Sequence, residues 1–243
     1  MKRLVRSVSV AVGSMLLLAA SGVAWYALSS PPVENLPLPP ELIGISSAEG
    51  QRLLAASTSK TDYAQLAPHL VAQARRAFCG PATSAAVINA ALRPHPPVTQ
   101  ASLFNAAAAA VKSELALSLS GLTLEELAAF LRAHGLQVRV LHARRSDPTS
   151  FRDAARAAGL GEPRTFLVVN YDRRVLLQSG AGHISPVGAL DSETDRLLVL
   201  DVATQKYPYT WVPASKLWAA MNTMDSDSGQ TRGYLLVSAG SRP

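Results

Sequence analysis

The spacing of hydrophobic and polar side chains predicts that the first half of the folded chain is helical. Apolar residues recur at helical spacing or within alanine-rich runs in four segments: 63–77, 80–92, 100–117 and 121–136. The last segment has the clearest boundaries, because Thr123 is placed to cap a helix and Glu126 completes a capping box. Gly135 is a typical residue at the end of such a helix.

The second half of the chain changes to alternating patterns and short apolar runs, which are typical of strands. They occur in five segments: 137–143, 165–172, 182–190, 196–202 and 233–239. One late helix is expected over 213–223. Helices followed by antiparallel strands indicate an α+β domain.

The N-terminus has the pattern of an export or anchoring segment. Its basic start, MKRLVR, is followed by an apolar run from Val8 to Leu28, which is long enough to span a bilayer. Trp25 and Tyr26 suit the membrane interface, and the basic end should stay in the cytoplasm. Since no Ala-x-Ala site follows, an uncleaved anchor is favoured over a cleaved signal peptide. Both place the rest of the chain outside the cytoplasm, in the periplasm, as a membrane-anchored or secreted protein.

A proline-rich stretch separates this segment from the rest of the chain. Such a stretch is stiff and extended, and no second linker or internal repeat follows it. We therefore divide the chain into a signal or anchor segment at 1–30, a linker at 31–41 and a single domain at 42–243.

Composition and charge narrow the classes of function. The formal charge of +6 is partly due to Lys2, Arg3 and Arg6, without which 20 basic face 17 acidic side chains, or +3. No long basic run with interleaved aromatic residues occurs, which argues against nucleic-acid binding. A single cysteine excludes an intramolecular disulfide and a zinc site with several thiolates.

That cysteine, Cys79, directly precedes the helix expected over 80–92. A thiol at a helix N-terminus lies at the positive end of the helix dipole, which favours the thiolate. A lone cysteine is otherwise most often a small buried hydrophobic residue. Its place at a helix start favours a nucleophile.

Among the five histidines, His183 has the surroundings expected of a catalytic base. It follows the stretch SGAG and opens an apolar strand. If this strand and 196–202 form a hairpin around Glu193, Asp201 becomes its diagonal neighbour on the same face. A carboxylate there can fix the imidazole tautomer and stabilise the imidazolium. The alternative is that Asp201 merely ends a strand.

Gln73 lies six residues before Cys79, where its amide can donate a hydrogen bond to a developing oxyanion. Gln-x5-Cys-Gly with a later histidine and a still later carboxylate is the papain-like arrangement. The expected fold is therefore a papain-like cysteine peptidase fold, with a helical first half and an antiparallel sheet in the second half.

Longer stretches resemble the phytochelatin synthase family, in family order: AFCGPATSAAVINAAL, GLTLEELAAFL, the region from GHISPVGAL to LWAAMNT, and TRGYLLV. The resemblance covers roughly Gln73 to Val237. Bacteriocin leader peptidases share Gln-x5-Cys-Gly but do not account for DVATQKYP or LWAAMNT. Because the cysteine-rich C-terminal extension of eukaryotic members is missing, the sequence looks like the short bacterial type.

The resemblance implies a glutathione γ-glutamylcysteinyltransferase or peptidase. By resemblance, Cys79 attacks the Cys–Gly amide of glutathione and His183 protonates the departing glycine. Asp201 orients His183, and Gln73 supports the oxyanion. The γ-Glu-Cys thioester on Cys79 is then resolved by water, which gives γ-Glu-Cys, or by a second glutathione, which gives phytochelatin.

The family pattern also implies how substrate is held. Arg232, Asp225 and Gly182 match positions near the acyl pocket, where an Arg–carboxylate pair can hold the α-carboxylate of the substrate. A surface ion pair is the alternative for Arg232 and Asp225.

No tightly bound cofactor and no metal held by the protein are expected. A heavy-metal ion, Cd²⁺ or Zn²⁺, would arrive as a glutathione thiolate complex. The expected partners are glutathione and, through the N-terminal segment, a membrane; a homodimer is a further candidate. Two other functions stay open, namely a papain-like peptidase for peptides or leader sequences, and an inactive binding domain.

Overall fold

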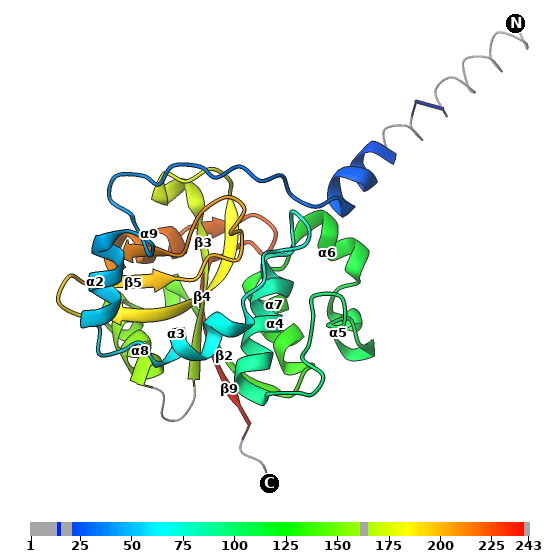
Figure 1. Ribbon diagram of the computed structural model, residues 1–243. Coiled ribbons are helices and arrows are strands. Elements are labelled where there is room, and N and C mark those ends of the chain that lie inside the picture. The colour runs from blue at the N-terminus through cyan, green and yellow to red at the C-terminus, as the bar shows by residue number, and fades with distance from the viewer. Residues whose placement is uncertain (1–13, 16–20, 161–164, 241–243) are drawn as a thin grey trace, which may run out of the picture.

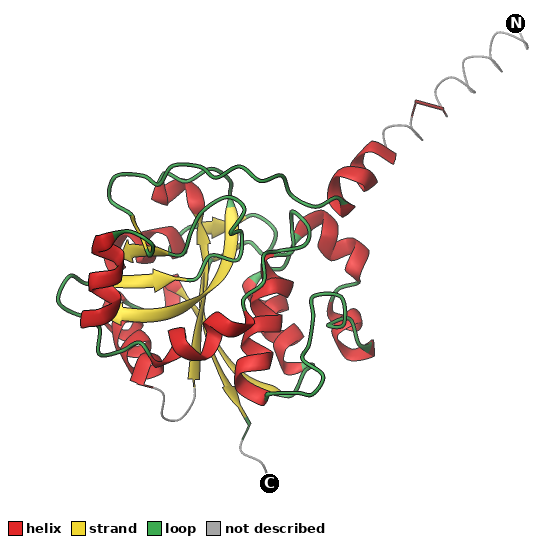
Figure 2. Ribbon diagram, in the orientation of Figure 1, coloured by secondary structure: helices red, strands yellow, loops and turns green. Residues whose placement is uncertain are grey.

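The computed structural model describes residues 14–15, 21–160 and 165–240, in which an antiparallel sheet is flanked by helices (Figures 1 and 2). Seven strands pair in the order β1-β6-β5-β4-β3-β9-β2, and every pair is antiparallel. This arrangement confirms the predicted α+β class. The strands of this sheet are β1 Ile43–Gly44, β2 Leu136–His142, β3 Thr165–Asp172, β4 Gly182–Asp191, β5 Arg196–Val199, β6 Thr210–Pro213 and β9 Gly233–Ala239. Two short strands, β7 Met224–Asp225 and β8 Gln230–Thr231, pair separately.

Both faces of the sheet are covered by helices, and β3 shows how. Phe166 and Val168 belong to a core shared with α4 and α7, whereas Leu167 and Val169 belong to a second core shared with α8 and α9. A strand that is buried on both faces has apolar side chains at successive positions, which explains the segment FLVV at 166–169 in β3. The helices are α2 Ala48–Ala56, α3 Thr61–Leu66, α4 Cys79–Leu92, α5 Ala106–Val111, α6 Glu114–Ser120, α7 Leu124–Arg132, α8 Pro148–Leu160 and α9 Ala214–Met221.

The helices with strong local signals form as expected. Helix α7 has the capping box of Thr123 and Glu126, and Gly135 after its end has a positive φ of 84°. Helix α4 is buried on all sides over residues 80–90, which fits its lack of charged side chains. The late helix is α9.

Two helix predictions were wrong in extent. The segment 63–77 is not one helix, because α3 ends at Leu66 and gives way to a 3₁₀ turn over Ala67–His69 that contains a proline. The segment 100–117 contains α5 and α6, each with its own N-cap: Asn105 caps α5 and Ser113 caps α6. A capping residue inside the alanine-rich run therefore divides it. Helix α8 was not predicted.

The hairpin of β4 and β5 brings residues 183 and 201 together. Near the turn Asp191 pairs with Arg196, but beyond an irregularity at Gly188 the pairing shifts by one, and Val187 pairs with Val199. A Cβ atom at residue 188 would lie 2.9 Å from a methyl carbon of Leu200, so a larger residue there would displace that side chain. Beyond β5, the amide of Leu200 still donates to the carbonyl of Pro186. The shifted register is the one that the sequence predicted.

The N-terminal part approaches the domain surface. The backbone amides of Glu34 and Asn35 donate to the carbonyl of Gln205, and the amide of Leu36 donates to that of Lys206. Residues 21–28 are helical and lie beside α6 (Figure 1).

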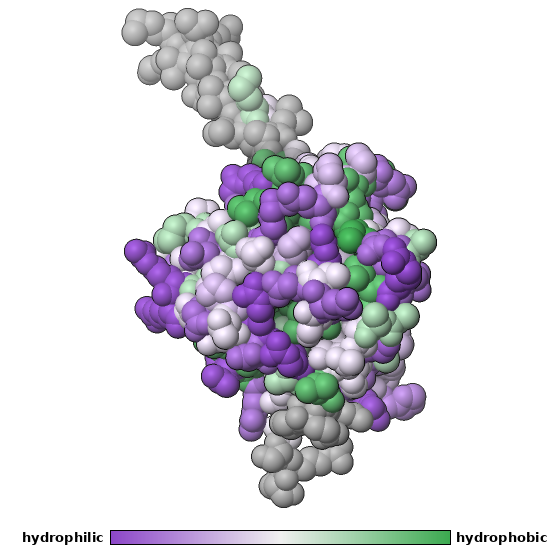
Figure 3. Space-filling model, turned by 90° about the vertical axis from the view of Figure 1, so that its left-hand side faces the viewer, coloured by the Kyte–Doolittle hydropathy of each residue, from purple (hydrophilic) through white to green (hydrophobic). Residues whose placement is uncertain are grey.

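Most of the predicted anchor segment 1–30 lies outside the described residues. Among the helices in the described ranges, none combines the length and the apolar character that a bilayer span requires. On the face in Figure 3, hydrophilic side chains are interspersed with smaller apolar groups. The domain boundary at 42 stays a prediction.

Candidate active site

Cys79 is the first residue of α4, which begins without a side-chain cap. The amide groups of the first helical turn lack intrahelical acceptors, so they are available to a negative charge at this end. Burial raises the pKa of the Cys79 thiol, but the hydrogen bond and positive charge of His183 and the amides of Ile184 and Gly80 outweigh it. The net effect lowers the pKa of Cys79, as a nucleophilic thiol requires.

His183 stands at the start of β4 and is held by Asp201, as the hairpin predicted. Its Nε2 lies 2.9 Å from Oδ1 of Asp201, which leaves Nδ1 for the thiol. The ring of Tyr171 packs edge-on against the imidazole, with ring centres 5.7 Å apart. Burial and the charge of Arg173 lower the pKa of His183, but the charge and hydrogen bond of Asp201 raise it above its usual value. The three side chains form a Cys–His–Asp triad.

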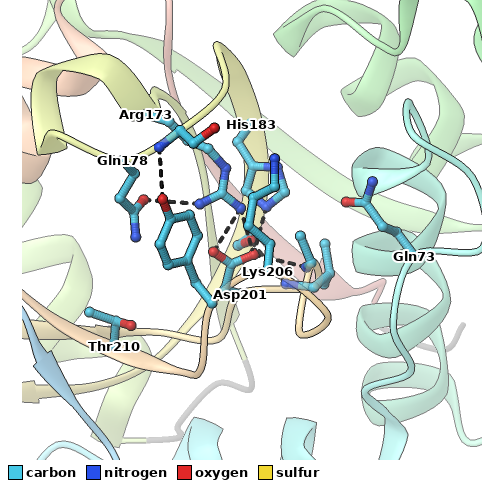
Figure 4. Close-up of polar contacts among 12 residues, drawn as sticks. Gln73, Arg173, Gln178, His183, Asp201, Lys206 and Thr210 are labelled. Carbon is cyan, nitrogen blue, oxygen red and sulfur yellow. Dashed lines mark hydrogen bonds and ion pairs between the residues drawn. The ribbon is translucent and has the colours of Figure 1, made fainter. Parts of the chain in front are cut away.

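Asp201 has further partners that the sequence analysis missed. Nη2 of Arg173 lies 2.8 and 2.7 Å from the two carboxylate oxygens, and the amide of Ala203 donates at 2.8 Å. Gln178 accepts from Nη1 of the same arginine (Figure 4). Burial raises the pKa of Asp201, but His183 and Arg173 together hold it far below its usual range. Arg173 was not among the residues singled out from the sequence, because only the fold shows that it is buried.

Gln73 lies near the triad but is engaged elsewhere. Both hydrogens of its side-chain amide are used, by the carbonyls of Arg75 at 2.9 Å and Arg76 at 2.7 Å. Its backbone amide donates to the carbonyl of Val202. In Figure 4 it stands apart from the group around Asp201. Its role as an oxyanion donor stays a prediction, since it requires one of these hydrogen bonds to be exchanged.

Arg232, Asp225 and Gly182 lie together in one cleft with Cys79 and His183, and the cleft has a volume of about 440 Å³. The guanidinium of Arg232 is buried and donates to Thr223 and to the carbonyl of Met224. Its Nη2 is 3.9 Å from Asp225, and its Nε has no hydrogen-bond partner in the described chain. A Cβ atom at residue 182 would lie 3.0 Å from Nη2, so glycine there admits the arginine. This is a built pocket with a free donor, not a surface ion pair.

No group of three or more His, Cys, Asp or Glu side chains within the described ranges is placed to hold a metal ion. Cys79 and His183 line the cleft, and the charged side chains of Arg232 and Asp225 lie in it as well. This arrangement suits nucleophilic attack on an acyl group by a thiolate, followed by proton donation to the leaving group.

Comparisons with known proteins identify one family. The Phytochelatin synthase family model matches residues 33–234. Glutathione gamma-glutamylcysteinyltransferase 3 of Lotus japonicus is 32% identical over 84% of this chain and 43% of its own length. Glutathione gamma-glutamylcysteinyltransferase 1 of Triticum aestivum is 33% identical over 84% of this chain and 41% of its own length. The Schizosaccharomyces pombe relative is 28% identical over 82% of this chain and 50% of its own length.

The chain thus spans half or less of these relatives, but the family-model match over residues 33–234 includes Cys79, His183 and Asp201. The family expected from the sequence is confirmed by these matches. The chain belongs to the phytochelatin synthase family.

Proposed function

We propose that the protein is a thiol acyltransferase or peptidase that cleaves the Cys–Gly bond of glutathione and retains γ-Glu-Cys as a thioester. The observation that carries this proposal is the Cys79–His183–Asp201 triad, whose Cys79 and His183 line the same cleft as Arg232 and Asp225. The names of the relatives support glutathione as the substrate.

The cleft suits a small substrate. Its volume of about 440 Å³ falls within the range of roughly 300–1,000 Å³ that is common for small-molecule sites. The unpartnered Nε of Arg232 and the nearby carboxylate of Asp225 complement the α-carboxylate and α-amino group of a γ-glutamyl residue. In this proposal the γ-Glu-Cys half of glutathione fills this cleft.

The reaction then follows from the triad. The Cys79 thiolate adds to the Cys–Gly carbonyl carbon, and an amide at the start of α4 stabilises the oxyanion; exchange of its present hydrogen bonds would allow Gln73 to contribute. His183 donates its proton to the glycine nitrogen as the C–N bond breaks, and glycine leaves. Neutral His183 next takes a proton from water or from the α-amine of a second glutathione, which attacks the thioester. The products are γ-Glu-Cys or (γ-Glu-Cys)₂-Gly, and the Cys79 thiolate is restored.

Three further features belong to the proposal. A heavy-metal ion, Cd²⁺ or Zn²⁺, enters as a thiolate complex of glutathione and so as part of the substrate. The N-terminal segment holds the domain outside the cytoplasm, in the periplasm, with an uncleaved anchor favoured. Homodimer formation is a further prediction, which sedimentation of the full chain would test.

The test is mass spectrometry of products from the full chain incubated with glutathione, with and without Cd²⁺. Cys79→Ser is the control, because it should lose acyl-enzyme formation while keeping the cleft. Metal-dependent (γ-Glu-Cys)₂-Gly would indicate a synthase, and γ-Glu-Cys with glycine alone would indicate a peptidase. Neither product from folded protein, or equal turnover by Cys79→Ser, would contradict the proposal and turn attention to leader peptides or to a binding role.

A further inference from the structure

We propose that Arg76 binds the carboxylate of the departing glycine and so selects substrates that end in a free carboxylate directly after the cleaved bond. The inference rests on the proposed function and adds a residue on the leaving-group side of the thiol. It assigns a role to an arginine that is not part of the triad and has no role in binding γ-Glu-Cys in the proposal above.

Arg76 lies where two hollows meet. It lines the cleft that contains Cys79 and Arg232, and it also lines a neighbouring hollow that contains Gln73 and Lys206. His183 borders both. If γ-Glu-Cys occupies the first hollow, the scissile bond lies near His183 and the glycine extends into the second.

The charge of Arg76 is free to bind a ligand, in contrast to that of its neighbour. Arg75 pairs with Glu114 at 2.7 Å and donates to Ser118 at 2.9 Å. Within the described chain Arg76 has no acidic partner in salt-bridge range, and its Nε is buried without a hydrogen-bond acceptor. The ring of Tyr26 covers one face of its guanidinium at 4.2 Å. Stacking uses the face of the group and leaves its edge for two parallel hydrogen bonds to a carboxylate.

The other cations of the second hollow already have partners. Lys206 lies 3.4 Å from Glu34, and Arg173 pairs with Asp201. Among the described residues of this hollow, Arg76 is therefore the cation best suited to meet an incoming carboxylate. Glycine carries such a group two atoms from the amide nitrogen that leaves, so one arginine at the border of the two hollows can reach it.

The experiment compares glutathione with γ-Glu-Cys-glycinamide, in which the terminal carboxylate is replaced by a neutral amide. Both form the same thioester on Cys79, so any difference arises before the amine leaves. For the full-length wild type we expect kcat/KM to be about 10- to 100-fold higher for glutathione, as for the loss of one charge-assisted pair. Arg76→Gln should lower kcat/KM for glutathione by a similar factor and leave the glycinamide rate unchanged.

Arg75→Gln is the matched control and should keep the wild-type preference. The inference is overturned if Arg76→Gln still prefers glutathione as strongly as the wild type does, or if it loses glycinamide turnover too, since that would indicate a structural role. A wild type without any preference overturns it as well. Absence of turnover of both substrates by the wild type would instead refute the proposed function, and this inference with it.

Discussion

Two aspartates of this protein are equally buried, but their surroundings shift the pKa of the carboxyl group in opposite directions. Asp201, beyond the end of β5, and Asp62, on α3, are each 2% exposed. Asp201 receives hydrogen bonds from Arg173, His183 and the amide of Ala203, and its pKa is held far below the usual range. Oδ1 of Asp62 has no hydrogen-bond partner in the described chain, and burial raises the pKa of Asp62 to about 8.

The difference shows that the partners of a buried carboxyl decide its charge. Burial penalises the ionised form at both positions. At Asp201 a buried guanidinium and an imidazole overcome that penalty, and the resulting anion in turn raises the pKa of His183. At Asp62 no ion pair among the described residues offsets it, and the raised pKa favours the neutral form at pH 7. The active-site charge is therefore created by the fold around Asp201.

Removing the charge of Asp201 should have the largest effect. Asp201→Asn is expected to lower kcat for glutathione by roughly 10³- to 10⁴-fold, because the imidazole loses its orientation and its stabilised cation. The pKa of His183 should fall, so the alkaline limb of the pH–rate profile should move to lower pH. Steady-state kinetics across pH measure both effects. The matched control is Asp62→Asn, which should keep wild-type kcat at pH 7; an equal loss there would mean that the effect is structural.

Removing Arg173 should leave Asp201 less well compensated, and so closer to the situation of Asp62. Arg173 and Asp201 are 3% and 2% exposed, and Arg173→Met leaves a buried carboxylate with fewer donors. We expect the free energy of unfolding at pH 7 to fall by roughly 3–5 kcal/mol. Urea denaturation measures it. Arg156→Met should cost less, because Arg156 and its partner Asp153 are both solvent-exposed. Similar losses in the two variants would argue against a special role for the buried pair.

The parts of the fold that sequence reasoning found are those fixed by neighbouring residues. The capping box of Thr123 and Glu126 locates α7, and the hairpin places His183 opposite Asp201. The extent of the helices over 63–77 and 100–117 was predicted wrongly, because Pro68 and the capping residues Asn105 and Ser113 compete with an otherwise helical composition. Helical periodicity alone carries no information about where such a run is divided.

The parts of the site that were missed depend on tertiary contacts. Arg173 and Arg174 are adjacent and chemically identical, yet Arg173 is buried against Asp201, whereas Arg174 pairs with Asp172 and is itself largely exposed. Arg75 and Arg76 differ in another respect, since only Arg75 meets an acidic partner in the described chain. Within each pair of arginines, sequence reasoning has no local signal to tell one from the other.

The contribution of Asp62 to stability should be smaller and should depend on pH in a defined direction. Its folded pKa of about 8 lies above the unfolded value of about 3.9, so the folded state binds this proton more tightly. The stability from this group is complete below about pH 4 and is lost as pH rises towards 8. Asp62→Asn stays neutral throughout. It should match the wild type near pH 4 and exceed it by roughly 2–4 kcal/mol at pH 8, since each unit of pKa difference corresponds to about 1.4 kcal/mol and relaxation reduces the full value.

Urea denaturation at pH 4, 6 and 8 measures this difference. Asp153→Asn is the matched control, because Asp153 is an exposed aspartate that pairs with Arg156 on α8. Its stability difference from the wild type should stay nearly constant between pH 6 and 8. If Asp62→Asn shows the same flat profile, Asp62 is charged in the folded protein, and burial without visible partners is not enough to neutralise a carboxyl here. If the difference grows with pH, the two aspartates hold opposite charge states at neutral pH, as their partners predict.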